Sequence, residues 1–238
     1  MKYLLTLFAA LTFHGLFAQF GVYGYYQNQY APGWEAAFGE QFQGKETVDF
    51  LTTGYRFGAD YWIKPLEDLR ITATPGLSYA RSSSTSIQNP ASPQIATTEF
   101  GHRNIGIIVP VNIYFFDLYG DCDCPTWSQS EPFLKKGFFF QVMPAAYVNS
   151  YRADNQEFAT IHKSTDFNFA LGVGAGLDIG FSDLITLSPT VRYVHNFGRY
   201  WQDLPFLTVG SIPDHDIRFK SDVRVWEFGL RLGVRLDY

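Results

Sequence analysis

Two short runs of side chains in this 238-residue chain combine types that could hold a metal ion. The first is Asp214, His215 and Asp216, whose carboxylate and imidazole groups are ligands for a divalent cation. Three adjacent residues rarely converge on one ion unless a distant segment supplies further ligands. We therefore expect a solvated loop here, and we predict no bound metal and no cofactor.

The second run is Asp121-Cys122-Asp123-Cys124, which contains both cysteines of the chain. Two thiols so close together should not persist in an oxidising compartment. A disulfide between Cys122 and Cys124 is sterically possible, but it would be strained and easily reduced. A metal held by two thiolates and two carboxylates is the alternative, with few ligands on offer.

Serine with a nearby histidine is the third pattern that could do chemistry, because a serine nucleophile needs a base within reach. His102, His162 and His195 are the candidate bases, and Ser150 and Ser164 are the candidate nucleophiles. No His-x-Ser pair occurs in any stretch that alternates like a strand. We therefore expect no catalytic residues and no enzyme activity.

The elements that must position these residues are clearest at residues 223–238. Every second side chain there is large and apolar, namely Trp226, Phe228, Leu230, Leu232, Val234, Leu236 and Tyr238. Successive side chains of a strand point to opposite faces, so one face of this strand is apolar. Soluble strands average about 5–6 residues, whereas a tilted membrane-spanning strand needs about 9–11. The length favours a strand that crosses a membrane.

Seven further stretches alternate in the same way, and eight is an even number, as in bacterial outer-membrane barrels. An aromatic content of 18%, with 21 glycines, fits the same class. We predict an all-β fold, an eight-stranded antiparallel up-and-down transmembrane β-barrel. Trp34–Phe42 is a rival for the first strand. The predicted strands are Phe20–Tyr30, Phe50–Lys64, Leu69–Arg81, Phe100–Asp117, Gly137–Tyr151, Phe167–Phe181, Leu184–Phe197 and Val223–Tyr238.

Residues 1–19 are predicted to be a secretory signal peptide that is removed. Lys2 precedes the apolar run Tyr3–Phe13, and Ala18 is a small residue just before the expected cut. The barrel domain is then residues 20–238, exported and integral to the outer membrane. Removing Lys2 leaves 17 of the 18 basic side chains against 23 acidic ones, a net charge of −6. This charge argues against nucleic acid as a partner.

The connector 118–136 is longer than this topology requires. If the chain ends on the periplasmic side, this connector lies there too, and short turns are the rule on that side. It contains Cys122, Cys124, Trp127 and Phe133, and aromatic side chains are enriched where proteins meet. We predict a structured element that docks a partner. A flexible loop that tolerates deletion is the alternative.

Four prolines, at positions 75, 110, 144 and 189, fall inside predicted strands. Proline donates no ladder hydrogen bond and is normally confined to edges or bulges, yet a closed barrel has no edge. We expect bulges or broken ladders at all four positions, at a similar depth in the barrel wall.

The same alternation assigns a set of charged side chains to the barrel interior. They could line a selective channel, or they could neutralise one another in a closed core. The interior of an eight-stranded barrel is just wide enough for side chains to fill it, and buried charges need partners. We expect paired charges and no path for ions. The set is Arg56, Asp60, Arg70, Asp178, Arg192, Glu227, Arg231 and Arg235.

From about Thr53 to Tyr238 the chain resembles the PorT-like outer-membrane β-barrel family of the Bacteroidota. The resemblance rests on the apolar stretch Asn104–Tyr114 with its internal proline, on Lys136–Pro144, and on the glycine-rich Gly172–Gly180. It implies an outer-membrane barrel, and the aromatic C-terminus is similar to those delivered by the barrel-assembly machinery. Some family members serve type IX secretion, so the resemblance does not imply one activity.

From these observations we expect a non-enzymatic integral barrel that acts as a subunit or scaffold of an envelope complex. Its expected partners are outer-membrane lipid and other envelope proteins. A surface-binding, adhesin-like barrel is the first alternative, because Tyr200, Trp201, Phe206 and Ile212 lie in the last predicted loop. A lipid-modifying outer-membrane enzyme is the second.

Overall fold

The computed structural model describes residues 19–35, 51–65, 69–83, 87–88, 97–115, 137–155, 160–181, 184–201 and 219–235. In these ranges no helix is long and apolar enough to cross a membrane. The strands are β1 (Gln19–Tyr30), β2 (Thr53–Trp62), β3 (Ile71–Ala73), β4 (Gly76–Ser83), β5 (Ile87–Gln88), β6 (Thr97–Ile108), β7 (Val111–Ile113), β8 (Phe138–Asn155), β9 (Thr160–Leu177), β10 (Ile179–Gly180), β11 (Ile185–Trp201) and β12 (Phe219–Arg235).

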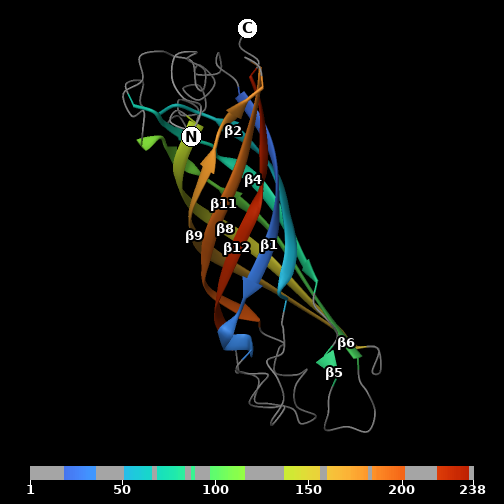
Figure 1. Ribbon diagram of the computed structural model, residues 1–238. Helices are drawn as coiled ribbons and strands as arrows, with labels where there is room; N and C mark the ends of the chain where they lie inside the picture. Colours follow the sequence, from blue (N-terminus) through green and yellow to red (C-terminus); the bar gives the residue numbers. More distant parts are fainter. Residues whose placement is uncertain are drawn as a thin grey trace, which may run out of the picture.

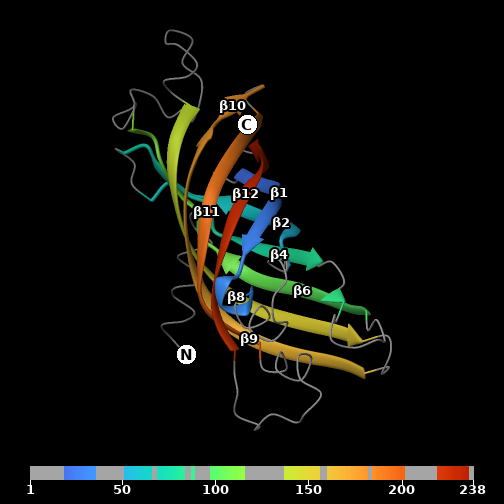
Figure 2. The same cartoon turned by 60° about the horizontal axis from the view of Figure 1, so that its bottom comes forward.

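The strands close into a barrel (Figure 1). Eight of them pair in the cyclic order β1, β2, β4, β6, β8, β9, β11 and β12, and β12 returns to β1. Every pairing is antiparallel, and Figure 2 shows β2, β4, β6, β8 and β9 side by side in this order. The short strands β3, β7 and β10 continue the walls of β4, β6 and β9. The predicted eight-stranded antiparallel barrel is confirmed.

Side chains sort by face along each wall. On β12 the outward Trp226, Phe228 and Leu230 are about half exposed, whereas the inward Val225 and Glu227 are buried. The other walls repeat this pattern, with large apolar groups outside and many polar groups inside. An apolar outer face around a polar interior is the pattern of a barrel that crosses a membrane.

The strand itself is interrupted at two of the four strand prolines. Thr74-Pro75 separates β3 from β4, and Val109-Pro110 separates β6 from β7. The N–H of Thr74 donates to the carbonyl of Pro110 at 2.8 Å, and the N–H of Val109 donates to the carbonyl of Pro144 at 3.0 Å. The two breaks therefore lie side by side in adjacent walls.

Pro144 and Pro189 lie in unbroken strands, but the ladder on one side of each is interrupted. In an antiparallel ladder the N–H and C=O of one residue face the same neighbour. The carbonyl of Pro144 faces Val109, so its missing donor faces the β6–β7 break. Pro189 lies level with Leu177, the last residue of β9, beside the interruption at Asp178. The ladder is thus broken on one side of each of these two prolines, while the β8–β9 and β11–β12 ladders stay continuous. The expectation of bulges or broken ladders at all four prolines is confirmed.

Four strands run further than the apolar alternation predicts. β8 and β9 leave only residues 156–159 between them, and β11 and β12 leave only residues 202–218. The loops predicted at Arg152–Ser164 and Gly198–Asp222 are therefore too long. The strands continue beyond the lipid-facing level, where the outward positions of β8 and β9 are polar and apolar alternation no longer marks the strand. The first strand is β1, which matches the predicted Phe20–Tyr30. The rival segment that begins at Trp34 is not a strand there, because Trp34 belongs to a helical turn.

Several predicted features fall outside the described residues. For two of the candidate residues, both in strands, the backbone is described but the side chain is not. These features are the predicted signal peptide up to residue 18, the connector 118–136 with Cys122, Cys124, Trp127 and Phe133, the run Asp214–Asp216, and the side chains of His162 and Arg235.

Candidate functional site: the barrel interior

Glu227 lies in the middle of the barrel interior between two arginines. Its Oε1 is 2.8 Å from Nε of Arg56, and its Oε2 accepts a hydrogen bond from Nε of Arg192. All three side chains are at most 1% exposed. Arg192 is the direct ladder partner of Glu227, whereas Arg56 comes from β2, two walls away. This central cluster therefore joins strands that are not neighbours in the barrel wall.

Neutral side chains satisfy further groups of the central cluster. Nε2 of Gln27 donates to Oε1 of Glu227 at 2.6 Å, and Nη1 of Arg56 donates to Oγ of Ser78 at 3.0 Å. Both neutral partners are buried. Buried charges are tolerated when such hydrogen bonds accompany the ion pair, so these contacts help to hold three ionised groups inside a narrow barrel.

Two tyrosine rings lie against the guanidinium groups of this cluster. Arg56 lies 4.6 Å from the ring centroid of Tyr147, and Arg192 lies 4.0 Å from that of Tyr25. A desolvated guanidinium over an aromatic ring gains about 2 kcal/mol. The rings therefore help to accommodate a cluster with two cations and one carboxylate.

Glycines in the wall make room for these large groups. A Cβ atom at Gly174 would lie 2.6 Å from Cβ of Arg192, and one at Gly229 would lie 2.5 Å from Cδ1 of Tyr25. Both distances are shorter than real non-bonded contacts allow. Because the inward glycines of β9 and β12 have no side chain, they leave room for arginine and tyrosine side chains from neighbouring walls.

A second charged pair lies nearer the end of the barrel where Gln19 meets Arg235. Nε of Arg231 is 3.0 and 2.9 Å from the two carboxylate oxygens of Asp60, and Nη2 is 2.6 Å from Oδ1. A Cβ atom at Gly21 would overlap both side chains. The bidentate pair therefore depends on a glycine in β1, between the two strands that supply its charges.

Asp178 belongs to a third group near the same end. It accepts a hydrogen bond from the hydroxyl of Tyr114 at 2.5 Å and another from the hydroxyl of Ser188. The guanidinium of Arg70 lies 4.9 Å from the ring centroid of Tyr114. In this group a cation and a carboxylate both contact the same tyrosine side chain.

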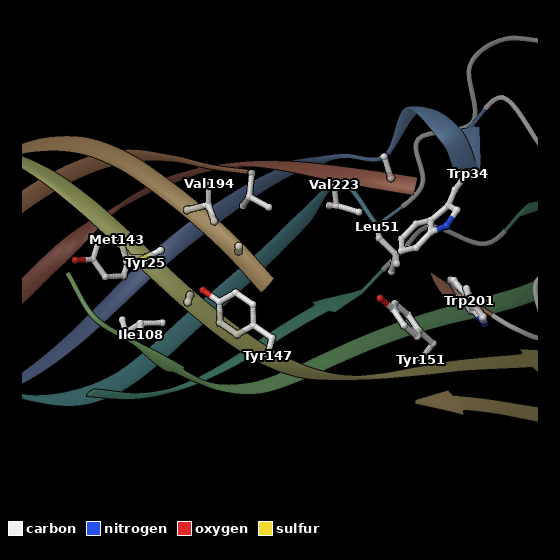
Figure 3. Packing of buried hydrophobic residues seen from close by; sticks show 14 of the residues in the cluster. Tyr25, Trp34, Leu51, Ile108, Met143, Tyr147, Tyr151, Val194, Trp201 and Val223 are labelled. Atoms are coloured by element: carbon white, nitrogen blue, oxygen red, sulfur yellow. The ribbon is translucent and has the colours of Figure 1, made fainter. Parts of the chain in front are cut away.

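Aromatic residues fill the opposite end of the lumen (Figure 3). Trp34, in the turn after β1, packs edge-on against Tyr151 and Trp201 at centroid distances of 5.6 and 5.8 Å. Tyr151 stacks on Trp201 on one side and on His102 on the other, at 4.9 Å in both cases. His102 Nε2 is 3.0 Å from Oδ1 of Asn149. We call Trp34, Tyr151, Trp201 and His102 the aromatic cap.

The structure divides the predicted interior charges into these groups. Arg56, Arg192 and Glu227 come together in the centre, and Asp60 meets Arg231. Arg70 and Asp178 share contact with Tyr114. The arrangement is that of charges neutralised at short range inside a packed core.

The aromatic cap and the buried Arg199 were missed in the sequence. Arg199 is 1% exposed, and its Nη2 donates to Oδ1 of Asn196 at 2.8 Å. It lies in a stretch predicted as loop, after a register shift between Asn196 and Arg199 that reverses the alternation. Gly198, with φ of 54°, was the available signal, because a left-handed glycine in a strand marks a bulge.

The absence of a His-x-Ser pair from the strands was predicted wrongly, because His162-Lys163-Ser164 lies in β9 and not in a loop. The candidate catalytic residues are spread over both faces of the wall. His102 points inward, whereas Ser150 points outward. Ser164 also points inward, but Tyr151 stands between it and His102 in the ladder. His195 is on the outer face. Among the described residues, no three His, Cys, Asp or Glu side chains come together as metal ligands would.

No protein-family model and no curated protein matches the chain. Among solved structures, it is similar to Ail, the attachment invasion locus protein of Yersinia pestis, at 9% identity and a TM-score of 0.42, over 92% of this chain and 98% of that one. Neisserial surface protein A is similar at 14% identity and 0.41, over 92% and 97%. The Escherichia coli outer membrane protease OmpT is similar at 6% and 0.41, over 92% and 97%. The barrel assignment rests on this chain's own strand pairings.

Proposed function

We propose that this chain is a non-enzymatic outer-membrane barrel that works through its surfaces, as a subunit or scaffold of an envelope complex. The observation that carries the proposal is the filled interior. The central cluster around Glu227 is at most 1% exposed, and so are Trp34 and Trp201 in the aromatic cap. An eight-stranded barrel is only wide enough to be filled by side chains, so the surfaces are left to carry the function.

The outer membrane is the proposed location because closed barrels with an even number of strands and an apolar outer face belong there. The strand lengths support this placement. β8 and β9 have 18 residues each, and β11 and β12 have 17. A tilted strand needs about 9–11 residues to cross a bilayer, so roughly seven residues of each long strand remain outside it. These extensions form an ordered sheet on which other proteins could assemble.

A secretion or outer-membrane assembly complex is the kind of complex we propose. The resemblance to the PorT-like family supports it, and so does the length of the connector 118–136, with Trp127 and Phe133 in a position where a short turn would suffice. The proposal gives the barrel no catalytic role. Turnover of lipid A by the purified barrel would contradict that part.

Affinity purification from native membranes tests the proposal. We expect the wild-type barrel to recover a stoichiometric envelope protein. Replacing Asp121–Glu131 with a Gly-Asn turn should leave folding and membrane insertion intact but abolish that recovery. The matched control replaces residues 89–96, which lie between β5 and β6, with the same Gly-Asn turn. Unchanged partner recovery after the Asp121–Glu131 replacement would remove the main support for a complex subunit.

A surface-binding barrel is the second candidate, favoured by the extension of β11 beyond the apolar band. Phe197 and Tyr200 are exposed there, whereas Trp201, which was expected in the external loop, is buried in the aromatic cap. Capture of a soluble or surface ligand by whole cells, lost on a Phe197→Ser and Tyr200→Ser double substitution, would favour this candidate. Recovery of only an envelope subunit would favour the first.

A further inference from the structure

The outer face of β4, β6, β8 and β9 changes character abruptly beyond one row of side chains. Tyr79, Ile105, Val148 and Phe167 are successive ladder partners across these four strands. They point outward, and all four are exposed. This row is the last on these walls to be formed by large lipid-facing groups, counted away from the end where Gln19 meets Arg235.

The next two outward rows contain cations and hydroxyl groups. Their eight positions hold four cations, three hydroxyls and one glycine, and no carboxylate. All are exposed except the half-buried glycine. We call these eight residues the basic patch. The first row is Arg81, Arg103, Ser150 and Thr165, and the second is Ser83, Gly101, Arg152 and Lys163.

Like charges face each other directly in both rows. Arg81 is the ladder partner of Arg103, and Arg152 is the ladder partner of Lys163. Opposed like charges destabilise a strand pair, because their Cβ atoms are only about 4.5–5.5 Å apart. Within the described ranges, the side chains of Arg81, Arg103 and Lys163 form no ion pair or hydrogen bond. An anion from outside the chain would relieve the repulsion between Arg81 and Arg103.

The opposite wall of the barrel is different at the same end. Arg224 of β12 is the ladder partner of His195, whose Nε2 is 3.8 Å from a carboxylate oxygen of Asp222. The outward positions of β12 there include a carboxylate, Asp222, two residues before Arg224. The charge imbalance is therefore a property of the β4–β9 side, and does not encircle the barrel.

The basic patch also has open space at its centre. A Cβ atom built on Gly101 would have no atom within 4 Å, whereas one on Gly106 of the same strand would lie 2.3 Å from a backbone oxygen. Gly101 stands between Ser83 and Arg152 in the second row. The missing side chain leaves room for a ligand group against the backbone of β6.

We propose that the basic patch binds phosphate groups on the headgroups of outer-leaflet glycolipid, which is lipopolysaccharide in chemical class. This inference rests on the proposed outer-membrane location. Arginine pairs well with phosphate through two parallel hydrogen bonds, and the hydroxyls of Ser150 and Thr165 can bond to phosphate or sugar. The patch adjoins the row from Tyr79 to Phe167, so the ligand that fits is an amphiphile with acyl chains on that row and its anionic head on the patch.

Native mass spectrometry of the purified full-length barrel with added lipid A tests the proposal. The wild type should retain lipid A, and retention should weaken as salt is raised, because the contacts are ionic. An Arg81→Gln and Arg103→Gln double variant should bind lipid A about 30-fold more weakly, given the usual contribution of each cation near an anionic surface. The matched control is Lys220→Gln with Arg224→Gln, which removes two cations from β12 and should leave lipid A retention unchanged.

Gly101→Glu provides a second variant that removes no cation. It adds a carboxylate to the basic patch at a position with free space, so folding should be preserved while lipid A retention falls. Equal retention by the wild type, the Arg81/Arg103 variant and the Gly101 variant would overturn the proposal. Retention of phosphatidylglycerol or of a soluble sulfated polysaccharide as tightly as lipid A would overturn the assignment to glycolipid.

The gel mobility of unboiled protein and its resistance to carbonate extraction separate this inference from the proposed function. Protein that inserts into membranes but retains no lipid A would overturn the patch inference alone. Protein that never inserts would overturn the outer-membrane location, and with it the glycolipid proposal.

Discussion

Arg192 on β11 and Glu227 on β12 face each other directly in the ladder, and their side chains meet inside the lumen with at most 1% exposure. Arg56 reaches the same carboxylate from β2. One buried carboxylate therefore compensates two buried cations. The stability of the barrel should depend on it more than on any charge at the surface.

Glu227→Gln tests this dependence while keeping the size of the side chain. Breaking a buried ion pair costs about 3–5 kcal/mol, because it leaves uncompensated charge in a place that water does not reach. We expect the free energy of unfolding, measured by urea titration in lipid vesicles, to fall by about this amount. Asp222→Asn, at the exposed rim, is the control and should change it by less than about 1 kcal/mol. Equal effects would contradict the central role of Glu227.

Arg231→Ala should lower stability without opening a pore. It removes the bidentate partner of Asp60, whose side chain is buried, while the central cluster still fills the lumen. We expect the unboiled form to lose its gel shift at a lower temperature than the wild type. Single reconstituted molecules of both proteins should show no steady conductance in planar bilayers. A steady ionic current through the wild type would refute the closed interior.

The apolar alternation was enough to predict the barrel, because every outward side chain at membrane depth faces lipid and must be apolar. Leu171 and Leu230 are exposed on the outer face, as this requires. Beyond that depth outward side chains face water and need not be apolar. For this reason the outer ends of β8 and β9 were predicted as loop. The prolines marked where the ladders are interrupted, but which strand each interruption ends could not be predicted, because it depends on the register of the neighbouring wall.

Leu171→Arg and Leu230→Arg should each destabilise the barrel by about 2–4 kcal/mol if their positions are near the bilayer midplane, because a lipid-facing cation loses its hydration. Gly174→Arg should fail for another reason. Its Cβ atom would lie 2.6 Å from Cβ of Arg192 and from the carbonyl oxygen of Val191. Urea unfolding in vesicles measures the first effect. Refolding yield measures the second, and Gly101→Arg, with open space around it, is the control. A normal yield for Gly174→Arg would contradict the crowding argument.

The charged residues of the barrel interior were predicted from the sequence, but the aromatic cap was not. Alternation marks which positions point inward, so Arg56 and Glu227 could be found from spacing alone. The partners of each charge depend on register between strands that are far apart in sequence, as with Arg56 and Glu227, 171 positions apart. Trp34 could not be found in this way, because it enters the lumen from a turn outside any strand.

Trp201→Ala tests whether the aromatic cap is a structural plug independent of the central cluster. Trp201 is 0% exposed and contacts Tyr151, Trp34 and Phe100, so truncation should cost about 3–5 kcal/mol through the cavity it leaves. Trp201→Phe keeps an aromatic ring and should recover part of that loss. Because the Arg56–Glu227–Arg192 cluster lies deeper in the lumen, neither variant should conduct ions steadily. Urea unfolding and planar-bilayer recordings on the same preparations check both statements, and a conducting Trp201→Ala barrel would show that the cap, not the central cluster, closes the lumen.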